Sequence, residues 1–179
     1  MQSPNSLGYM SMNPVQTSEL PPNVLLQKYQ LEGAKTDCYF IDLPKQVSHI
    51  EYVEAFYTSK LFKVERHILA LCVRKPSSDE QAKNLAHGKE SHFAAWGVEQ
   101  QTKNQLLLCD FLGKTRSWLM SVSDKNSDTT RLYFGSAVVA KRKSANGEAK
   151  FGVLFHALGL FHHLYSKALL KAACSRLLR

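Results

Sequence analysis

Hydrophobic and polar residues alternate along most of the second half of the chain. Alternation with a period of two is typical of half-buried strands, and short polar or glycine-bearing turns separate the alternating segments. The pattern predicts four consecutive strands, at residues 92–100, 105–111, 114–123 and 129–143. Because the connections are short, we expect neighbouring strands to pair antiparallel.

The first half of the chain combines one strand with helices. Residues 36–43 alternate as a strand, and Ser48 with Glu51 forms the capping-box pattern that opens a helix. A second helix is predicted over residues 61–73, where apolar positions recur with helical spacing.

Two further helices complete the predicted elements. Ser77 and Glu80 repeat the capping-box pattern, and Gly88 is placed to end this short helix. A long amphipathic helix then closes the chain over residues 150–178. The expected fold is therefore α+β: a curved antiparallel sheet of about five or more strands, packed on a long C-terminal helix, with two or three helices inserted after the first strand.

Residues 1–35 differ from the rest in composition. They are rich in Ser, Asn, Gln, Met and Pro and show no sustained periodicity, which is typical of a flexible leader. The predicted organisation is a leader at 1–35 and a single helix-grip-like α+β domain at 36–179. Two alternatives stay open for the leader: residues 24–29 dock on the domain, or the leader supplies a strand to the sheet.

Composition adds a prediction of compartment. Hydrophobic residues make up 44% of the 179 residues, enough for a substantial core. No apolar segment approaches the roughly 18 residues that span a bilayer, and the N-terminus lacks a secretory signal pattern. The cysteines fall in apolar segments without metal-type spacing, which indicates reduced core thiols and a cytoplasmic protein (Cys38, Cys72, Cys109 and Cys174).

The formal net charge is +8, so polyanionic partners need to be considered. The basic residues are spread along the chain, and no focused patch is evident. We therefore expect no specific nucleic-acid partner.

Strand alternation groups a set of candidate ligand-binding residues: Trp96, Glu99, Asp110, Arg116, Trp118, Arg131 and Tyr133. Large aromatic walls with a few polar groups are typical of small-molecule sites. Trp96, Trp118 and Tyr133 would form the walls, and Arg116 could pair an anionic group. In the alternative interpretation, Arg116 pairs with Asp110 across a hairpin and Arg131 faces solvent.

Catalytic and metal-binding fingerprints are not evident in the sequence. There is no GxGxxG or P-loop pattern, and the histidines of the last helix lack the spacing for a shared metal. We predict no cofactor and no metal. Two alternatives to ligand binding stay open: an enzyme using Glu99 or Asp110 as general acid or base, and a non-catalytic interaction module with a basic surface.

The order of elements resembles the START-like helix-grip superfamily, which includes the birch-pollen-allergen type. Four segments also look like an uncharacterised bacterial family of unknown function: FYTSKLF at 56–62, FAAW at 93–96, TRSWL at 115–119 and LYFGSAV at 132–138. The resemblance implies a cavity between the sheet and the C-terminal helix. The expected function is binding of a small, largely apolar or amphiphilic molecule there, and no catalytic residue is implied.

Overall fold

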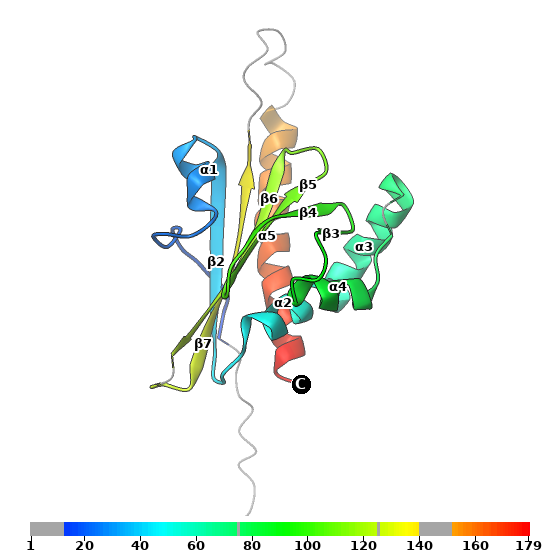
Figure 1. The fold of residues 1–179 in the computed structure, drawn as a ribbon. Helices are drawn as coiled ribbons and strands as arrows, with labels where there is room; N and C mark the ends of the chain where they lie inside the picture. The colour runs from blue at the N-terminus through cyan, green and yellow to red at the C-terminus, as the bar shows by residue number, and fades with distance from the viewer. Residues whose placement is uncertain (1–12, 75, 125, 140–151) are drawn as a thin grey trace, which may run out of the picture.

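An antiparallel sheet of seven strands forms the centre of the molecule (Figure 1). The computed structural model describes residues 13–74, 76–124, 126–139 and 152–179, without the side chains of 68–70, 72–73 and 152–162. The strands lie in the order β1-β2-β7-β6-β5-β4-β3. Their bounds are β1 Gln16–Thr17, β2 Lys35–Leu43, β3 His92–Phe93, β4 Trp96–Gln101, β5 Gln105–Asp110, β6 Thr115–Asp124 and β7 Thr129–Val138.

Five helices accompany the sheet in the described ranges, and the predicted α+β fold is confirmed. Three of them follow β2, as expected for helices inserted after the first long strand, and the last one packs on the sheet. Their bounds are α1 Gln27–Leu31, α2 His49–Tyr57, α3 Lys60–Val73, α4 Asp79–Ala86 and α5 Gly152–Leu177.

The strand predictions differ from the structure at two places. The segment expected as one strand at 92–100 is a tight hairpin of β3 and β4, because Ala94 adopts a positive φ of 51° between them. The last meander strand ends at Val138, and residues 140–143 of its expected range lie outside the described residues.

The helix starts follow capping chemistry. The Ser48 hydroxyl accepts a hydrogen bond from the Glu51 amide, and the Glu51 carboxylate accepts from the Ser48 amide, which confirms this capping box. In α4 the capping box is formed one residue later than expected, by Ser78 and Gln81. Ser77 is engaged instead by the guanidinium of Arg66, which donates to its hydroxyl at 3.0 Å and to its carbonyl at 2.5 Å.

One face of the sheet packs against α2, α4 and α5. This face carries the larger core, whose strand contributions include Tyr39, Ile41, Leu119, Leu132 and Phe134. These residues alternate with those of the opposite face, as strand geometry requires. From α5 the buried side chains include Ser166, Leu169, Leu170, Ala173 and Cys174.

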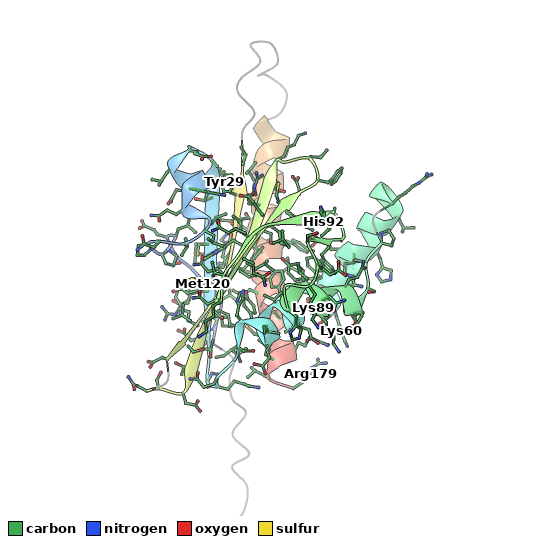
Figure 2. All side chains as sticks on the ribbon, viewed as in Figure 1. Tyr29, Lys60, Lys89, His92, Met120 and Arg179 are labelled. Carbon is green, nitrogen blue, oxygen red and sulfur yellow. The ribbon has the colours of Figure 1, made fainter. Side chains whose placement is uncertain are left out.

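The opposite face is covered by the segment before β2. Val24, Leu26 and Tyr29 are buried there against Trp118 and Met120, and Figure 2 shows Tyr29 and Met120 on the α1 side of the sheet. The structure thus differs from the expected leader boundary: β1 pairs with β2, and residues 20–34 cover a second core. Apolar residues spaced without regular periodicity can still be buried when they cover a sheet. Residues 1–12 lie outside the described residues.

The cysteines described by the structure are free thiols. Cys38 and Cys174 are buried, and Cys109 is half-buried. Burial raises the pKa of the Cys174 thiol to about 12. The side chain of Cys72 lies outside the described residues.

Candidate functional site

A cavity of about 270 Å³ lies between the helix-bearing face of the sheet and α5. Its apolar lining comes from five elements: Phe56, Tyr57, Phe62, Trp96, Phe134 and Leu169. Its polar lining includes Glu65, Thr115, Ser117, Ser136, Tyr165 and Ser166. The lining is therefore rich in aromatic rings and also carries six hydroxyl groups and one carboxylate.

Ring contacts connect the aromatic walls. The ring centroids of Tyr57 and Phe62 lie 4.9 Å apart in an edge-to-face arrangement, and those of Phe56 and Phe134 lie 5.0 Å apart. Tyr57 also meets Phe93 edge to face at 5.2 Å. Such pairs add to the free energy of burial, so α2, α3 and the sheet hold the walls in fixed positions.

Two hydroxyl groups in the lining are buried without a hydrogen-bond partner. The residues Tyr57 and Ser166 are 1% and 0% exposed, and neither hydroxyl has a partner of ordinary geometry in the described part of the chain. Burial raises the pKa of the Tyr57 phenol, and the nearby Ser117 hydroxyl opposes this increase. Buried polar groups in native proteins are nearly always paired, so both hydroxyls are candidates to meet a ligand.

The carboxylate of the lining is held by a tyrosine. The Tyr165 hydroxyl donates a short hydrogen bond to Glu65, which joins α5 to α3. Burial raises the pKa of the Tyr165 phenol, and the negative charge of Glu65 adds to the increase.

Ser136 belongs to a chain of polar contacts that begins at the cavity. Its hydroxyl donates to Asp37 at 2.7 Å, and the Tyr39 hydroxyl lies 3.2 Å from the same carboxylate and 2.9 Å from His163 Nδ1. A serine nucleophile requires an adjacent base such as histidine, whereas here the carboxylate and Tyr39 stand between Ser136 and His163. The arrangement orients Ser136 and connects the sheet to α5.

The structure divides the sequence-predicted site residues between the two faces of the sheet. Trp96 lines the cavity. Trp118 is fully buried on the opposite face, where its ring lies 6.1 Å from that of Tyr133. The three aromatic residues expected to form one set of walls therefore do not enclose one space.

Arg116 has its guanidinium on the face that α1 covers. Its Nε donates to Glu99 at 2.6 Å and to the Tyr29 hydroxyl at 2.8 Å, and the guanidinium stacks on the Tyr29 ring 4.5 Å from the centroid. Lys28 also pairs with Glu99, at 2.5 Å. Strand alternation means that Arg116 contributes backbone to the cavity lining, while its charge lies on the other side of the sheet.

The environment of Glu99 favours its ionised form. Burial alone would raise its pKa, but hydrogen bonds from Lys28, Tyr29 and Arg116 outweigh burial and hold the pKa below its ordinary value. Glu99 is thus a paired anion on β4 that links α1, through Lys28 and Tyr29, to β6, through Arg116.

The two remaining candidates lie near chain turns and the surface. Arg131 is exposed and forms a bidentate pair with Asp42, at 2.6 and 2.8 Å. Asp110 accepts a hydrogen bond from the Lys114 amide at 2.7 Å and so closes the β5–β6 turn. The alternative cross-hairpin pair of Arg116 with Asp110 is not formed, because Glu99 takes its place.

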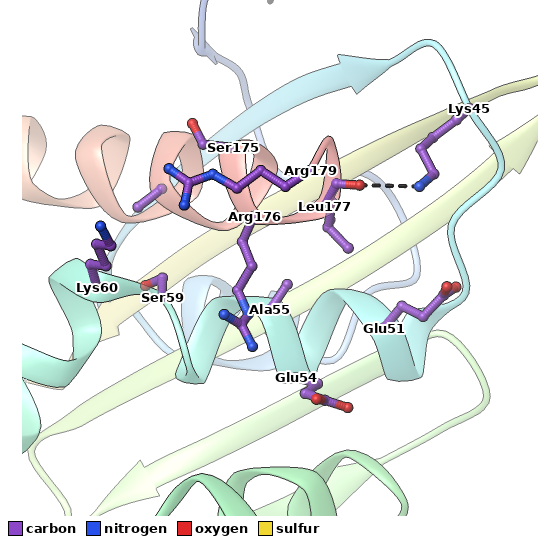
Figure 3. Close-up of a pocket in the computed structure, with 11 residues that line it drawn as sticks. Lys45, Glu51, Glu54, Ala55, Ser59, Lys60, Ser175, Arg176, Leu177 and Arg179 are labelled. Carbon is purple, nitrogen blue, oxygen red and sulfur yellow. Dashed lines mark hydrogen bonds between the residues drawn. The ribbon is translucent and has the colours of Figure 1, made fainter.

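A second hollow of about 480 Å³ lies between α2 and the end of α5 (Figure 3). Its charged lining mixes both signs, with Lys45, Lys60, Arg176, Arg179, Glu51 and Glu54. The Lys45 ammonium donates to the Leu177 carbonyl at 3.1 Å, which satisfies one of the carbonyl groups at the C-terminal end of α5.

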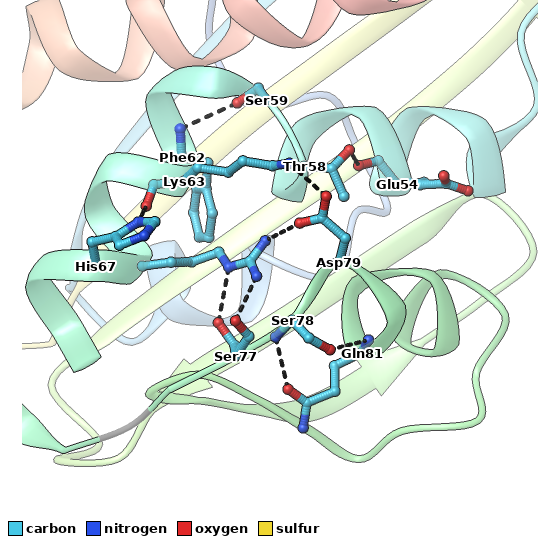
Figure 4. A network of polar contacts seen from close by, with 11 residues as sticks. Glu54, Thr58, Ser59, Phe62, Lys63, His67, Ser77, Ser78, Asp79 and Gln81 are labelled. Atoms are coloured by element: carbon cyan, nitrogen blue, oxygen red, sulfur yellow. Dashed lines mark hydrogen bonds and ion pairs between the residues drawn. The ribbon is translucent and has the colours of Figure 1, made fainter.

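Figure 4 shows the polar network that joins α3 to the start of α4. Asp79 accepts from Lys63 at 2.5 Å and from Arg66 at 2.7 Å. The hydrogen bond from Lys63 is the main reason that the pKa of Asp79 is lowered. This network joins α3 to α4 by charged hydrogen bonds and lines a hollow of about 420 Å³ beside the two helices.

Tyr57, Ser117, Ser136 and Ser166 are not among the site residues predicted from the sequence. One signal was available for Ser136, which shares its face of β7 with the apolar residues Leu132, Phe134 and Val138, whereas Ser117 shares its face of β6 with Thr115 and Ser121 and gives no such signal. Ser166 gives a similar signal, since it lies on the same side of α5 as the buried Leu169, Leu170 and Ala173.

Within the described ranges, no helix combines the length and the apolarity needed to cross a bilayer, and no three metal-ligating side chains are grouped. Comparison with protein-family models, curated proteins and solved structures found no match to this chain.

Proposed function

We propose that the protein binds a small, largely apolar molecule in the cavity between the sheet and α5. The observation that carries the proposal is the lining itself: aromatic and aliphatic side chains from α2, α3, α5 and the sheet surround about 270 Å³. Apolar walls with a few polar groups are what small-molecule sites share.

The volume limits the size of the ligand. A cavity of about 150 Å³ can bind benzene. In proportion, 270 Å³ accommodates roughly ten heavy atoms, close to a molecule with two fused rings. This volume lies just below the range of about 300–1,000 Å³ that is usual for ligand pockets, which favours a small ligand.

The position of the cavity agrees with what the resemblance to the helix-grip superfamily implies. Membership of that superfamily, a cytoplasmic location and a bacterial origin stay predictions. The cavity supports ligand binding independently of these predictions, because its lining and its size alone suit a small apolar molecule.

Ligand binding is favoured over the two alternatives. The two carboxylates predicted as general acid or base do not line this cavity, because Glu99 is paired on the other face and Asp110 closes a turn. The carboxylate that does line the cavity, Glu65, accepts a hydrogen bond from Tyr165. A basic interaction module would need a surface of one sign, whereas Glu51 and Glu54 lie among the cations near the end of α5.

Calorimetric titration of the full-length protein with naphthalene tests the proposal, together with native mass spectrometry for co-purifying molecules. Ser166→Leu should fill the cavity and abolish naphthalene binding. Ser175→Leu, on the exposed side of the same helix, should leave it unchanged. Thermal melting of each variant verifies folding. Absence of binding to the wild type, or equal binding to a folded Ser166→Leu variant, would contradict the proposal.

A further inference from the structure

The two buried hydroxyls of the cavity indicate which chemical groups the ligand carries, whereas the cavity volume indicates only its size. Tyr57 comes from the end of α2 and Ser166 from the middle of α5, so separate elements present them to the same cavity. Neither hydroxyl has a hydrogen-bond partner of ordinary geometry among the described residues, although the Ser117 hydroxyl lies near that of Tyr57. A hydroxyl that is buried in this way loses its bonds to water and gains none in return.

From this arrangement we infer that the ligand carries a neutral hydroxyl or carbonyl group that hydrogen-bonds to Tyr57 or Ser166. The inference rests on the proposed function and narrows its ligand class. A serine or tyrosine hydroxyl can both donate and accept a hydrogen bond, so it can bind an alcohol, a phenol or a ketone.

The charges around the cavity disfavour an anionic ligand. Glu65 contributes a carboxylate to the lining. Arg116 is the one cationic residue that the described lining contains, and its guanidinium pairs with Glu99 and Tyr29 on the other face of the sheet. A ligand carboxylate would therefore be desolvated beside a like charge and without a counter-ion.

A cationic ligand is disfavoured for a different reason. The Tyr165 hydroxyl already donates to Glu65, and the Tyr57 and Ser166 hydroxyls are the groups that lack a partner. A neutral polar group satisfies these hydroxyls without the cost of desolvating a charge. The expected ligands are thus hydroxylated or carbonyl-bearing ring compounds of roughly ten heavy atoms.

Four matched probes test the inference on the full-length protein: naphthalene, 2-naphthol, 2-naphthoate and 2-naphthylmethylammonium. The wild type should bind 2-naphthol about tenfold more tightly than naphthalene, and both ions more weakly than 2-naphthol. In the double variant Tyr57→Phe/Ser166→Ala the preference should disappear, so that 2-naphthol and naphthalene bind with about equal affinity. The two single variants then identify which hydroxyl makes the bond.

A matched control uses two hydroxyls from the same helices. Tyr52 donates to the Tyr133 carbonyl and Ser175 to the Lys171 carbonyl. The control variant Tyr52→Phe/Ser175→Ala should keep the tenfold preference. The ligand-free Tyr57→Phe/Ser166→Ala protein should melt no lower than the wild type, because its lost hydroxyls have no partner within the described protein.

The outcomes separate this inference from the proposed function. If no probe binds the wild type, the cavity is not a ligand site and both fail. If naphthalene binds but the 2-naphthol preference is absent, or persists in the Tyr57→Phe/Ser166→Ala variant, the site stands and the inference is overturned. Tighter binding of either ion, or a melting temperature several degrees lower in that variant, also overturns it.

Discussion

The indole nitrogen of Trp118 donates a hydrogen bond to the side-chain oxygen of Gln105 at 2.9 Å. The same oxygen accepts a hydrogen bond from the backbone amide of Leu25, also at 2.9 Å. Gln105 therefore satisfies a fully buried tryptophan and at the same time fastens the segment that covers it.

We expect Gln105→Leu to lower the free energy of unfolding by about 1–3 kcal/mol, because it leaves two donors without their acceptor. Gln100→Leu, at an exposed position of β4, should change it by less than about 0.5 kcal/mol. Urea unfolding of both variants measures the difference. Equal stability of the two variants would mean that water replaces the Gln105 oxygen at no cost.

Trp118 also illustrates how far strand alternation can predict the fold. The pattern correctly placed Arg116, Trp118 and Met120 on one face of β6, and the structure pairs them with residues of the same face of β7. Alternation relates residues to one another, but it does not say which face a helix covers. Both faces are covered here, so the face of Trp118 could not be assigned to α5 or to the N-terminal segment.

The cavity depends on docking between elements distant in the sequence. Tyr57 and Ser166 reach the same space only because α2 and α5 pack on one face of the sheet. Hydrophobic periodicity predicts each helix but not their relative placement. The partner of Arg116 was missed for the same reason, since Glu99 is brought to it by sheet pairing and the bulge between Val98 and Gln100.

Close packing of Trp118 requires glycine at position 135. A Cβ atom at Gly135 would lie 2.9 Å from both the Asp37 carbonyl oxygen and the Trp118 ring. Gly135→Ala should therefore cost about 1–3 kcal/mol of stability through overpacking. At Gly97 a Cβ atom would meet the His92 ring at 3.5 Å and the Ser91 carbonyl oxygen at 4.0 Å, both ordinary contact distances, so Gly97→Ala should cost less than about 0.5 kcal/mol. Thermal and urea unfolding compare the two, and a tolerated Gly135→Ala would contradict the packing argument.

His49 should make the protein less stable in mild acid. It is buried at the start of α2, where its Nε2 has no partner in the described part of the chain, and burial lowers its pKa from 6.5 to about 4. Above pH 6.5 both folded and unfolded states carry a neutral imidazole. As the pH falls from 6.5 to 4, the unfolded state binds a proton that the folded state does not, so stability is lost.

The free energy of unfolding should fall by about 3 kcal/mol because of His49, and this loss should be complete below pH 4. Urea unfolding at several pH values measures it, and the wild type should show a steeper decline than His49→Gln over this range. His87→Gln, at an exposed position, is the control and should retain the wild-type slope. Parallel curves for wild type and His49→Gln would show that His49 is protonated in the folded protein.

Removing the hydroxyl should have different effects on protein stability at two buried tyrosines of α2. Tyr52 donates to the Tyr133 carbonyl at 2.9 Å, so Tyr52→Phe should cost about 1 kcal/mol. The Tyr57 hydroxyl has no hydrogen-bond partner of ordinary geometry among the described residues, so Tyr57→Phe should leave stability unchanged or raise it by about 1 kcal/mol. Urea unfolding of the two ligand-free variants and the wild type measures both changes in the free energy of unfolding. Equal destabilisation would indicate that Tyr57 is satisfied within the protein.

Substitution of Arg116 distinguishes most clearly between a structural role of this residue and a role in binding an anionic ligand. Its side chain is 12% exposed and pairs with Glu99 on the face covered by α1. Arg116→Met should cost about 1–2 kcal/mol at neutral pH, because Glu99 loses a charged donor. Since the pKa of Glu99 is held below its ordinary value of 4.5, this cost should be full above pH 4.5 and shrink as the pH falls and the carboxyl group is protonated.

Arg131→Met is the matched control for that variant, because Arg131 forms an exposed pair with Asp42 and should cost at most about 1 kcal/mol. Both variants should bind naphthalene and 2-naphthoate as the wild type does, since neither guanidinium faces the cavity. If Arg116→Met instead weakens 2-naphthoate selectively while naphthalene binds normally, Arg116 acts as the anionic anchor that the sequence suggested. In that case the guanidinium must leave Glu99 and Tyr29 when such a ligand binds.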